Sequence, residues 1–241
     1  MSNQWLDQTE RGTLALVKII RWIAVSCGRR FTRVFLYPVC LYFYFTAQLQ
    51  REASREYLTK VLGTQPKFGA VFKHLHTFAA TLVDRVYFLT NRFDQFDIEI
   101  DDQSPLLKYI AEKRGCILLG AHIGSFEVMR ALAVSRKTFP IKILMNEGHN
   151  GRITALLHAL NPAIVETLIP MVSIESVMQL KEEIEQGAII GILGDRAIAG
   201  AKSTEVEFLG ASANMPTGPL QIASILKAPV VICYGIYQGK N

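Results

Sequence analysis

The stretch LLGAHIGSFEVM, residues 118–129, contains a histidine and a glutamate whose spacing is suited to acid–base chemistry. Glu127 follows His122 by five positions, and on one regular helix such side chains lie about 140° apart and do not meet. They can meet only if His122 lies in the turn after a strand and Glu127 in the first turn of the next helix. We therefore predict an apolar strand before the histidine, a tight turn at Gly124 and a helix capped by Ser125.

In that arrangement His122 and Glu127 form a general-base dyad. The carboxylate accepts a hydrogen bond from one ring nitrogen and fixes the tautomer, so the other nitrogen can take a proton from a substrate hydroxyl. Glu127 is also favoured near a helix N-terminus by the helix dipole. Ser125 is an alternative nucleophile, although HIGSFE differs from the GxSxG elbow. A structural pairing without catalysis is the alternative interpretation of the spacing.

The rest of the sequence predicts the elements that must hold this pair. Strands separated by helices indicate a three-layer α/β domain with a mostly parallel sheet and helices on both faces. Three segments are apolar throughout, as expected for strands covered on both sides: 116–121, 188–194 and 229–235. Further strands are predicted over 93–100, 141–146, 163–169 and 204–210. Helices are predicted over 51–63, 67–92, 104–115, 125–136, 151–160, 173–187 and 217–227.

The N-terminal part differs from this body in charge. Residues 1–60 hold nine basic and four acidic residues, which accounts for the whole net charge of +5. Residues 13–27 have the pattern of a helix with a basic face, which Arg29 and Arg33 extend. Residues 34–47 carry no charge and are rich in aromatic side chains. At 14 residues the second run is shorter than a membrane-spanning helix needs. We therefore predict that residues 1–62 form a membrane-associated helical segment and that 63–241 form the α/β domain.

Two core helices of a soluble protein are the alternative for the N-terminal segment. A basic segment on a neutral body favours an anionic membrane surface over nucleic acid, for which no motif is present. No GxGxxG or Walker A sequence supports nucleotide binding. The four cysteines lie far apart in apolar runs without a CxxC, so we predict buried free thiols in a reducing compartment and no metal site.

Beyond these patterns, GAHIGSFEVMRAL resembles the H-x4-D/E block of the lipid A late acyltransferases, the lauroyl and myristoyl transferase branch of the lysophospholipid acyltransferase group. MNEGHNGRI and GDRAIAGAKSTEVEFLGASANMPTGP are similar to the family's second and Asp-containing blocks. The resemblance covers roughly residues 1–236, and the N-terminal segments resemble an uncharacterised predicted-acyltransferase subgroup most. The family normally continues with further strands and a helical part, so the chain is either a fragment or ends early.

The resemblance implies transfer of a fatty acyl group from acyl carrier protein or coenzyme A, as co-substrate and without a further cofactor, to a hydroxyl of a membrane lipid or glycolipid. It also implies a place on the cytoplasmic face of the bacterial inner membrane. His122 and Glu127 are then the catalytic residues. Residues expected to bind substrate are Gly124, Ser125, Asn146, Arg152, Asp195 and Arg196, with main-chain N–H groups at 124–126 facing the oxyanion. Departures in the second and third blocks leave the acceptor open, and the sequence does not predict an oligomeric state.

Two other functions are compatible with the same residues. A thioesterase would use the His/Glu pair to activate water. A non-catalytic membrane protein would use the fold to bind lipid.

Overall fold

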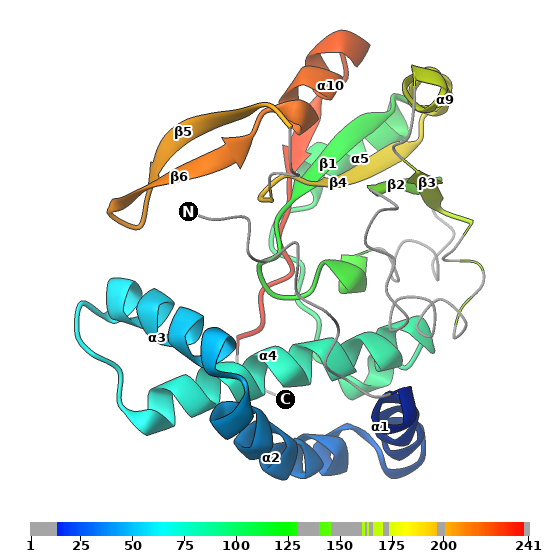
Figure 1. Cartoon of the computed structure of the whole chain (residues 1–241). Helices are drawn as coiled ribbons and strands as arrows, with labels where there is room; N and C mark the ends of the chain where they lie inside the picture. Colours follow the sequence, from blue (N-terminus) through cyan, green and yellow to red (C-terminus); the bar gives the residue numbers. More distant parts are fainter. Residues whose placement is uncertain are drawn as a thin grey trace. The chain divides into compact units, whose positions relative to one another are not determined.

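The computed structural model describes residues 14–129, 140–145, 161, 163, 166–170, 174–196 and 201–238. The chain divides into two compact units. One unit contains helices α1 to α4, and the other contains the parallel sheet (Figure 1). The helix predicted over 151–160 and the predicted substrate-binding residues Asn146 and Arg152 lie outside the described residues.

The helical unit contains four helices joined by short connections, together with the segment Glu207–Ala213. The helices are α1 (Leu14–Cys27), α2 (Arg29–Thr46), α3 (Gln48–Leu62) and α4 (Phe68–Leu89). Gly28, with a φ of 82°, separates the first two, and Gly63, with a φ of 67°, ends α3 as predicted. None of the helices in the described ranges is long and apolar enough to cross a membrane.

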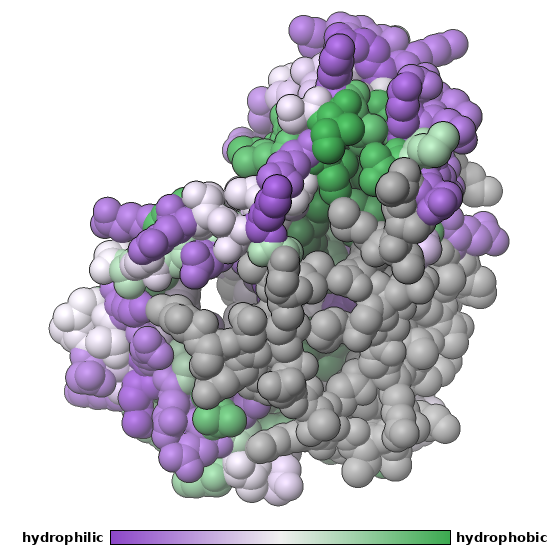
Figure 2. Space-filling view, turned by 45° about the horizontal axis from the view of Figure 1, so that its top comes forward, coloured by the Kyte–Doolittle hydropathy of each residue, from purple (hydrophilic) through white to green (hydrophobic). Residues whose placement is uncertain are grey.

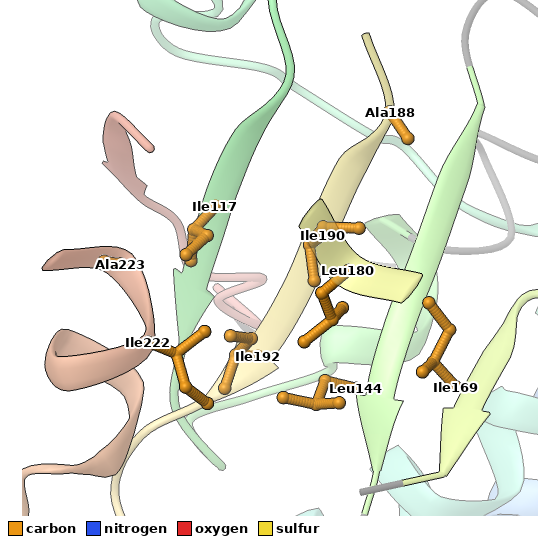
Figure 3. Packing of buried hydrophobic residues seen from close by; sticks show 9 residues of the cluster. All are labelled: Ile117, Leu144, Ile169, Leu180, Ala188, Ile190, Ile192, Ile222 and Ala223. Atoms are coloured by element: carbon orange, nitrogen blue, oxygen red, sulfur yellow. The ribbon is translucent and has the colours of Figure 1, made fainter. Parts of the chain in front are cut away.

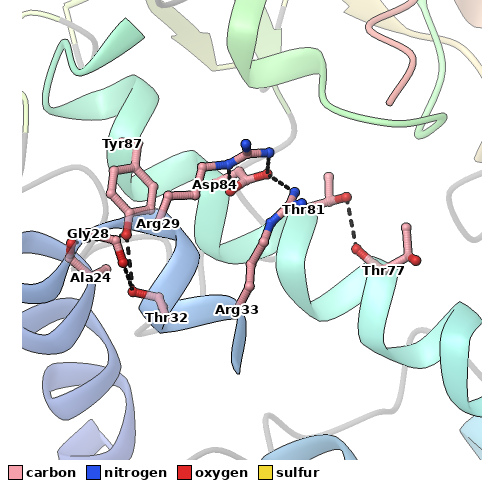
Figure 4. A network of polar contacts seen from close by, with 9 residues as sticks. All are labelled: Ala24, Gly28, Arg29, Thr32, Arg33, Thr77, Thr81, Asp84 and Tyr87. Atoms are coloured by element: carbon pink, nitrogen blue, oxygen red, sulfur yellow. Dashed lines mark hydrogen bonds and ion pairs between the residues drawn. The ribbon is translucent and has the colours of Figure 1, made fainter. Parts of the chain in front are cut away.

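A buried polar network ties α2 to α4 (Figure 4). Arg29 donates from Nε and Nη2 to the two carboxylate oxygens of Asp84, at 2.9 and 3.1 Å, and Arg33 Nη2 lies 2.9 Å from the same carboxylate. The Tyr87 hydroxyl donates to a main-chain carbonyl of α1 and lies 3.1 Å from Thr32 Oγ1. The prediction of a continuous basic face is therefore wrong for Arg29, which is 5% exposed and paired inside the protein.

The parallel sheet has the strand order β3-β2-β4-β1-β7. All four described strand pairings are parallel. The strands are β1 (Cys116–Gly120), β2 (Ile141–Met145), β3 (Leu168–Pro170), β4 (Ile189–Leu193) and β7 (Val230–Ile232). Cys116 pairs with Ile189 and Gly120 with Leu193, so β1 and β4 run side by side and end together.

Alternate residues of the central strands pack against helices on opposite faces. On one face, Ile117, Ile190 and Ile192 form a core with Leu180 of α9 (Ile174–Glu185) and Ile222 of α10 (Gly218–Leu226) (Figure 3). On the other face, strand residues pack against α5 (Ser104–Ala111), and the residues involved are Cys116, Leu118, Ile189, Leu106, Tyr109 and Ile110. The described residues thus confirm a three-layer α/β arrangement with a parallel sheet.

Two predictions about β structure need correction. Residues 93–100 are not a strand, because they form the short helix η1 (Phe93–Gln95) followed by irregular backbone. Phe93 and Phe96 pack against Phe88, with ring centroids 6.1 and 4.3 Å away, so the apolar spacing reflects aromatic packing. The second correction concerns β6 (Ala211–Pro216), which the sequence did not predict. It pairs with β5 (Ser203–Phe208), which was predicted as a strand over 204–210.

Candidate functional site

His122 lies two residues beyond the end of β1, at the carboxyl edge of the parallel sheet. Leu193 is the partner of Gly120 in β4, and continuing this register two residues further places Asp195 opposite His122. The N–H of Gly194 donates to the Gly120 carbonyl at 2.9 Å, so the two chain segments stay paired beyond the strands. The position of His122 at a strand end, which the sequence predicted, is confirmed.

Asp195 holds His122 through two hydrogen bonds. Its Oδ1 lies 2.9 Å from the His122 ring Nδ1, and its Oδ2 accepts from the His122 main-chain N–H at 3.0 Å. A carboxylate at Nδ1 favours the tautomer with the proton on Nδ1 and a lone pair on Nε2. The Phe126 ring and the imidazole pack in a T-shaped arrangement, with ring centroids 5.7 Å apart. This is the geometry of an oriented general base.

The pKa of Asp195 is lowered from its ordinary value of 3.8. Burial acts in the opposite direction and is the largest single influence. The hydrogen bonds from the side chain and main chain of His122, together with charge attraction, outweigh it. The carboxylate is therefore ionised at neutral pH and available to support a protonated imidazole.

This pKa direction predicts an acid-dependent loss of stability. A carboxyl group whose pKa is lower in the folded state stabilises the protein fully above pH 3.8, and that stabilisation is lost as the pH falls through the folded-state pKa. We expect urea denaturation to show a larger loss between pH 5 and pH 3 for the wild type than for Asp195→Asn. Equal losses in the two proteins would contradict the prediction.

The loop after His122 is held against the segment after β7. Gly124 has a φ of 65° and forms a parallel bridge with Gly235, and the Ser125 N–H donates to the Gly235 carbonyl at 2.7 Å. A Cβ atom on Gly124 would collide with the Gly235 carbonyl oxygen, and one on Gly235 would collide with the Ser125 carbonyl oxygen. The predicted turn at Gly124 is confirmed, but the Ser125 N–H is occupied and cannot serve as an oxyanion donor.

We expect Gly124→Ala to lower activity strongly, because the loop must move away from residue 235 to admit the methyl group. Gly63→Ala is a matched control, since Gly63 has a φ of 67° and open space around its Cβ position. The control should cost only the strain of a left-handed residue, about 1 to 2 kcal/mol, and keep its activity. Activity assays with urea denaturation of both variants would test this, and equal activity would contradict the role assigned to the loop.

Glu127 lies in the first turn of a helix that starts at residue 126, as predicted, and is fully buried. Its dyad with His122 stays a prediction, because the partner that the structure describes for Nδ1 is Asp195. Ser125 directly precedes the helix. Its Oγ is buried without a hydrogen-bond partner in the described part of the chain, so a Ser125 cap is not supported there.

Other predicted residues contribute less to the described site. Arg196 follows Asp195 directly and is exposed. The prediction of buried thiols is confirmed for Cys40 and Cys116 and is wrong for Cys27, which is exposed, whereas Cys233 is partly buried. Burial and the charge of Cys116 raise the pKa of Cys233 to about 11, so this thiol near the strand ends is protonated and a poor nucleophile at neutral pH.

From the sequence, Asp195 was predicted only to bind substrate, and its hydrogen bonds with His122 were not predicted. The available signal was its position after an apolar strand, where charged residues often face a site. The choice of β4 as the direct neighbour of β1 could not be read from the sequence.

A family model for bacterial lipid A biosynthesis acyltransferases matches residues 3–241. The match spans nearly the whole sequence, so the chain belongs to this acyltransferase family. The comparison with curated proteins found no match.

Proposed function

We propose that the protein transfers a fatty acyl group from an acyl thioester, carried by acyl carrier protein or coenzyme A, to a hydroxyl group of a lipid or glycolipid. The observation that carries the proposal is the pair of hydrogen bonds that Asp195 accepts from His122, which leaves His122 Nε2 as the ring nitrogen for chemistry. Family membership supplies the reaction class, and the residues supply the roles.

In this mechanism His122 Nε2 takes the proton from the acceptor hydroxyl as its oxygen attacks the thioester carbonyl. The carbon–sulfur bond breaks when the tetrahedral intermediate collapses. The leaving thiolate then takes the proton from the imidazolium, which restores neutral His122. No protein nucleophile and no further cofactor are required, because the acceptor oxygen attacks directly.

We assign Asp195 as the carboxylate that positions His122 and stabilises the imidazolium. The sequence assigned that role to Glu127, and a dyad of His122 with Glu127 is the competing proposal. The two carboxylates differ in setting: Asp195 is partly exposed beside the ring, whereas Glu127 is fully buried at a helix start.

Substrate binding is proposed for the residues that the resemblance indicated. Arg152 and Arg196 would hold phosphate groups of the donor or acceptor, and Asn146 would contact the acceptor. Gly124 and Ser125 would line the reacting carbonyl. The N-terminal segment would place the site at an anionic membrane, on the cytoplasmic face of the bacterial inner membrane.

The proposal is tested by incubating a labelled acyl thioester with a bacterial lipid extract and either wild type or His122→Ala. We expect a new acylated lipid with the wild type only. Release of free fatty acid alone would favour a thioesterase, and binding of lipid without either product would favour a non-catalytic protein. Equal product from both proteins would falsify the role of His122.

A further inference from the structure

The imidazole of His122 contacts two side chains that come from different elements. Asp195, which follows β4, lies 2.9 Å from the ring Nδ1. Phe126, at the start of the next helix, packs against the ring at a centroid distance of 5.7 Å, with 73° between the two ring planes. The side chain of His122 is 30% exposed, so part of the ring stays open to substrate.

A hydrogen bond at Nδ1 does not by itself fix the orientation of the imidazole. It holds one atom of the ring, and the ring plane can still turn about that contact. Turning the plane moves Nε2, which must come within about 2.6–3.2 Å of the acceptor hydroxyl. A misplacement of about 1 Å can lower the rate on the order of 10²-fold, so a second contact that fixes the plane has a large effect.

The backbone that carries Phe126 is fixed independently of the histidine. The N–H of the preceding residue, Ser125, donates to the Gly235 carbonyl at 2.7 Å, and Phe126 is the first residue of the helix. The following residue, Glu127, is fully buried, so the helix cannot roll without exposing its carboxylate. The ring is therefore presented to His122 by a part of the fold that does not depend on the imidazole.

Phe126 differs from the apolar side chains that are exposed on the same unit. Figure 2 shows hydrophobic side chains gathered in its upper part, over the elements of the parallel sheet. Next to the catalytic loop, Ile123 is 50% and Ile236 66% exposed, so both are accessible to substrate. Phe126 is only partly exposed and packs against the imidazole, which indicates a role that acts through His122.

We propose that Phe126 is a positioning residue for the general base, which fixes the plane of the His122 ring while Asp195 fixes its Nδ1. The inference rests on the proposed function in that His122 acts as the base. Phe126 contributes no proton and no charge, and it sets the direction in which Nε2 points. An aromatic side chain suits this role because aromatic pairs favour a T-shaped arrangement at this separation, whereas an aliphatic side chain has no preferred angle to the imidazole.

The first test compares the kinetics of Phe126→Leu and Phe126→Tyr. Leucine keeps an apolar side chain but removes the ring, so we expect kcat for acyl transfer to fall about tenfold to 10²-fold while KM changes little. Tyrosine keeps the ring and should retain most of kcat. An equal loss in both variants, or a raised KM with unchanged kcat, would overturn the inference, because Phe126 would then serve only in packing or in substrate binding.

NMR of histidine-labelled protein gives a second readout that needs no acyl donor. In the wild type we expect NOEs between the ring protons of His122 and Phe126, with the His122 signals identified by their loss in His122→Ala. In Phe126→Leu these signals should broaden, because the ring plane becomes free to turn, and tyrosine should restore them. Absence of the wild-type NOEs would overturn the inference even if the leucine variant does not fold.

Phe96→Leu is the matched control. Phe96 is also partly buried and packs against an aromatic ring, but that ring is Phe88, at a centroid distance of 4.3 Å. We expect this variant to keep the wild-type kcat and the His122 signals, and circular dichroism should show that it stays folded. An equal fall of kcat in the control, or unchanged ring signals in Phe126→Leu, would contradict the positioning role. Failure of the wild type itself to transfer an acyl group would instead contradict the proposed function.

Discussion

Asp195→Asn is expected to lower kcat/KM about 10²- to 10⁴-fold, the size of a general-base contribution. The amide keeps the size of the side chain but offers an N–H group to His122 Nδ1. The amide can therefore stabilise the other tautomer of His122, in which Nε2 carries the proton. Nε2 then cannot accept the proton of the acceptor hydroxyl. The charge that supports the imidazolium is also lost.

A purely structural role for Asp195 would give a different pattern, so the test includes readouts beyond activity. We expect KM to change little while kcat falls. We also expect the pH–rate profile of the variant to lack the rise in rate that deprotonation of the general base His122 gives in the wild type. Nitrogen NMR of the His122 ring should show the change of tautomer directly. Asp195→Glu should recover part of the activity, because it restores the charge.

Glu127→Gln is the decisive comparison, since it changes the other carboxylate in the same way. Our assignment predicts that this variant retains more activity than Asp195→Asn. If Glu127→Gln is the severe variant and Asp195→Asn is mild, the dyad predicted from the sequence is correct and the assignment of Asp195 is wrong.

Asp84→Ala is expected to destabilise the helical unit by about 3 to 5 kcal/mol, the usual cost of removing one partner from a buried ion pair. Asp84 binds two arginines, and Arg29 is only 5% exposed, so its guanidinium would remain buried without its counter-charge. Urea denaturation followed by circular dichroism measures the loss.

Glu56→Ala is the matched control for that variant. Glu56 pairs with Lys60 at 3.8 Å on the exposed side of α3, and its side chain is 70% exposed. Such a pair contributes about 0.3 to 0.5 kcal/mol, so the free energy of unfolding of the control should be close to that of the wild type. The double variant Arg29→Met/Asp84→Leu should be less destabilised than Asp84→Ala, because the guanidinium of Arg29 is no longer left buried without its counter-charge and only Arg33 loses its partner. A small loss in Asp84→Ala would contradict the importance of this network.

Local patterns predicted most of the described elements well. Continuous apolar runs marked the central strands, and Gly63 correctly marked the end of a helix. The pattern failed over 93–100, where apolar side chains contact Phe88 in the same part of the chain instead of a neighbouring strand. It also missed β6, whose sequence ASANMP has few strand-forming residues and is placed by the turn at Leu209 and Gly210, both with positive φ.

In the helical unit, local patterns also failed to predict which charged residues are buried. The sequence grouped Arg29 and Arg33 with the basic face of a membrane-associated helix, because helical spacing continued across residue 28. The break at Gly28 changes the direction of the chain, and Asp84, 55 residues after Arg29, takes up the charge. Spacing along one helix carries no information about an acid on another.

The sequence by itself determined that His122 lies at a strand end, that a glycine turn follows, and that Glu127 enters the next helix, because each depends on neighbouring residues. Only the tertiary structure decided which carboxylate holds the ring. Asp195 is 73 residues away in the chain and reaches His122 because β4 is paired with β1 in a register that continues past both strands. That pairing results from packing of the whole sheet, which no local pattern encodes.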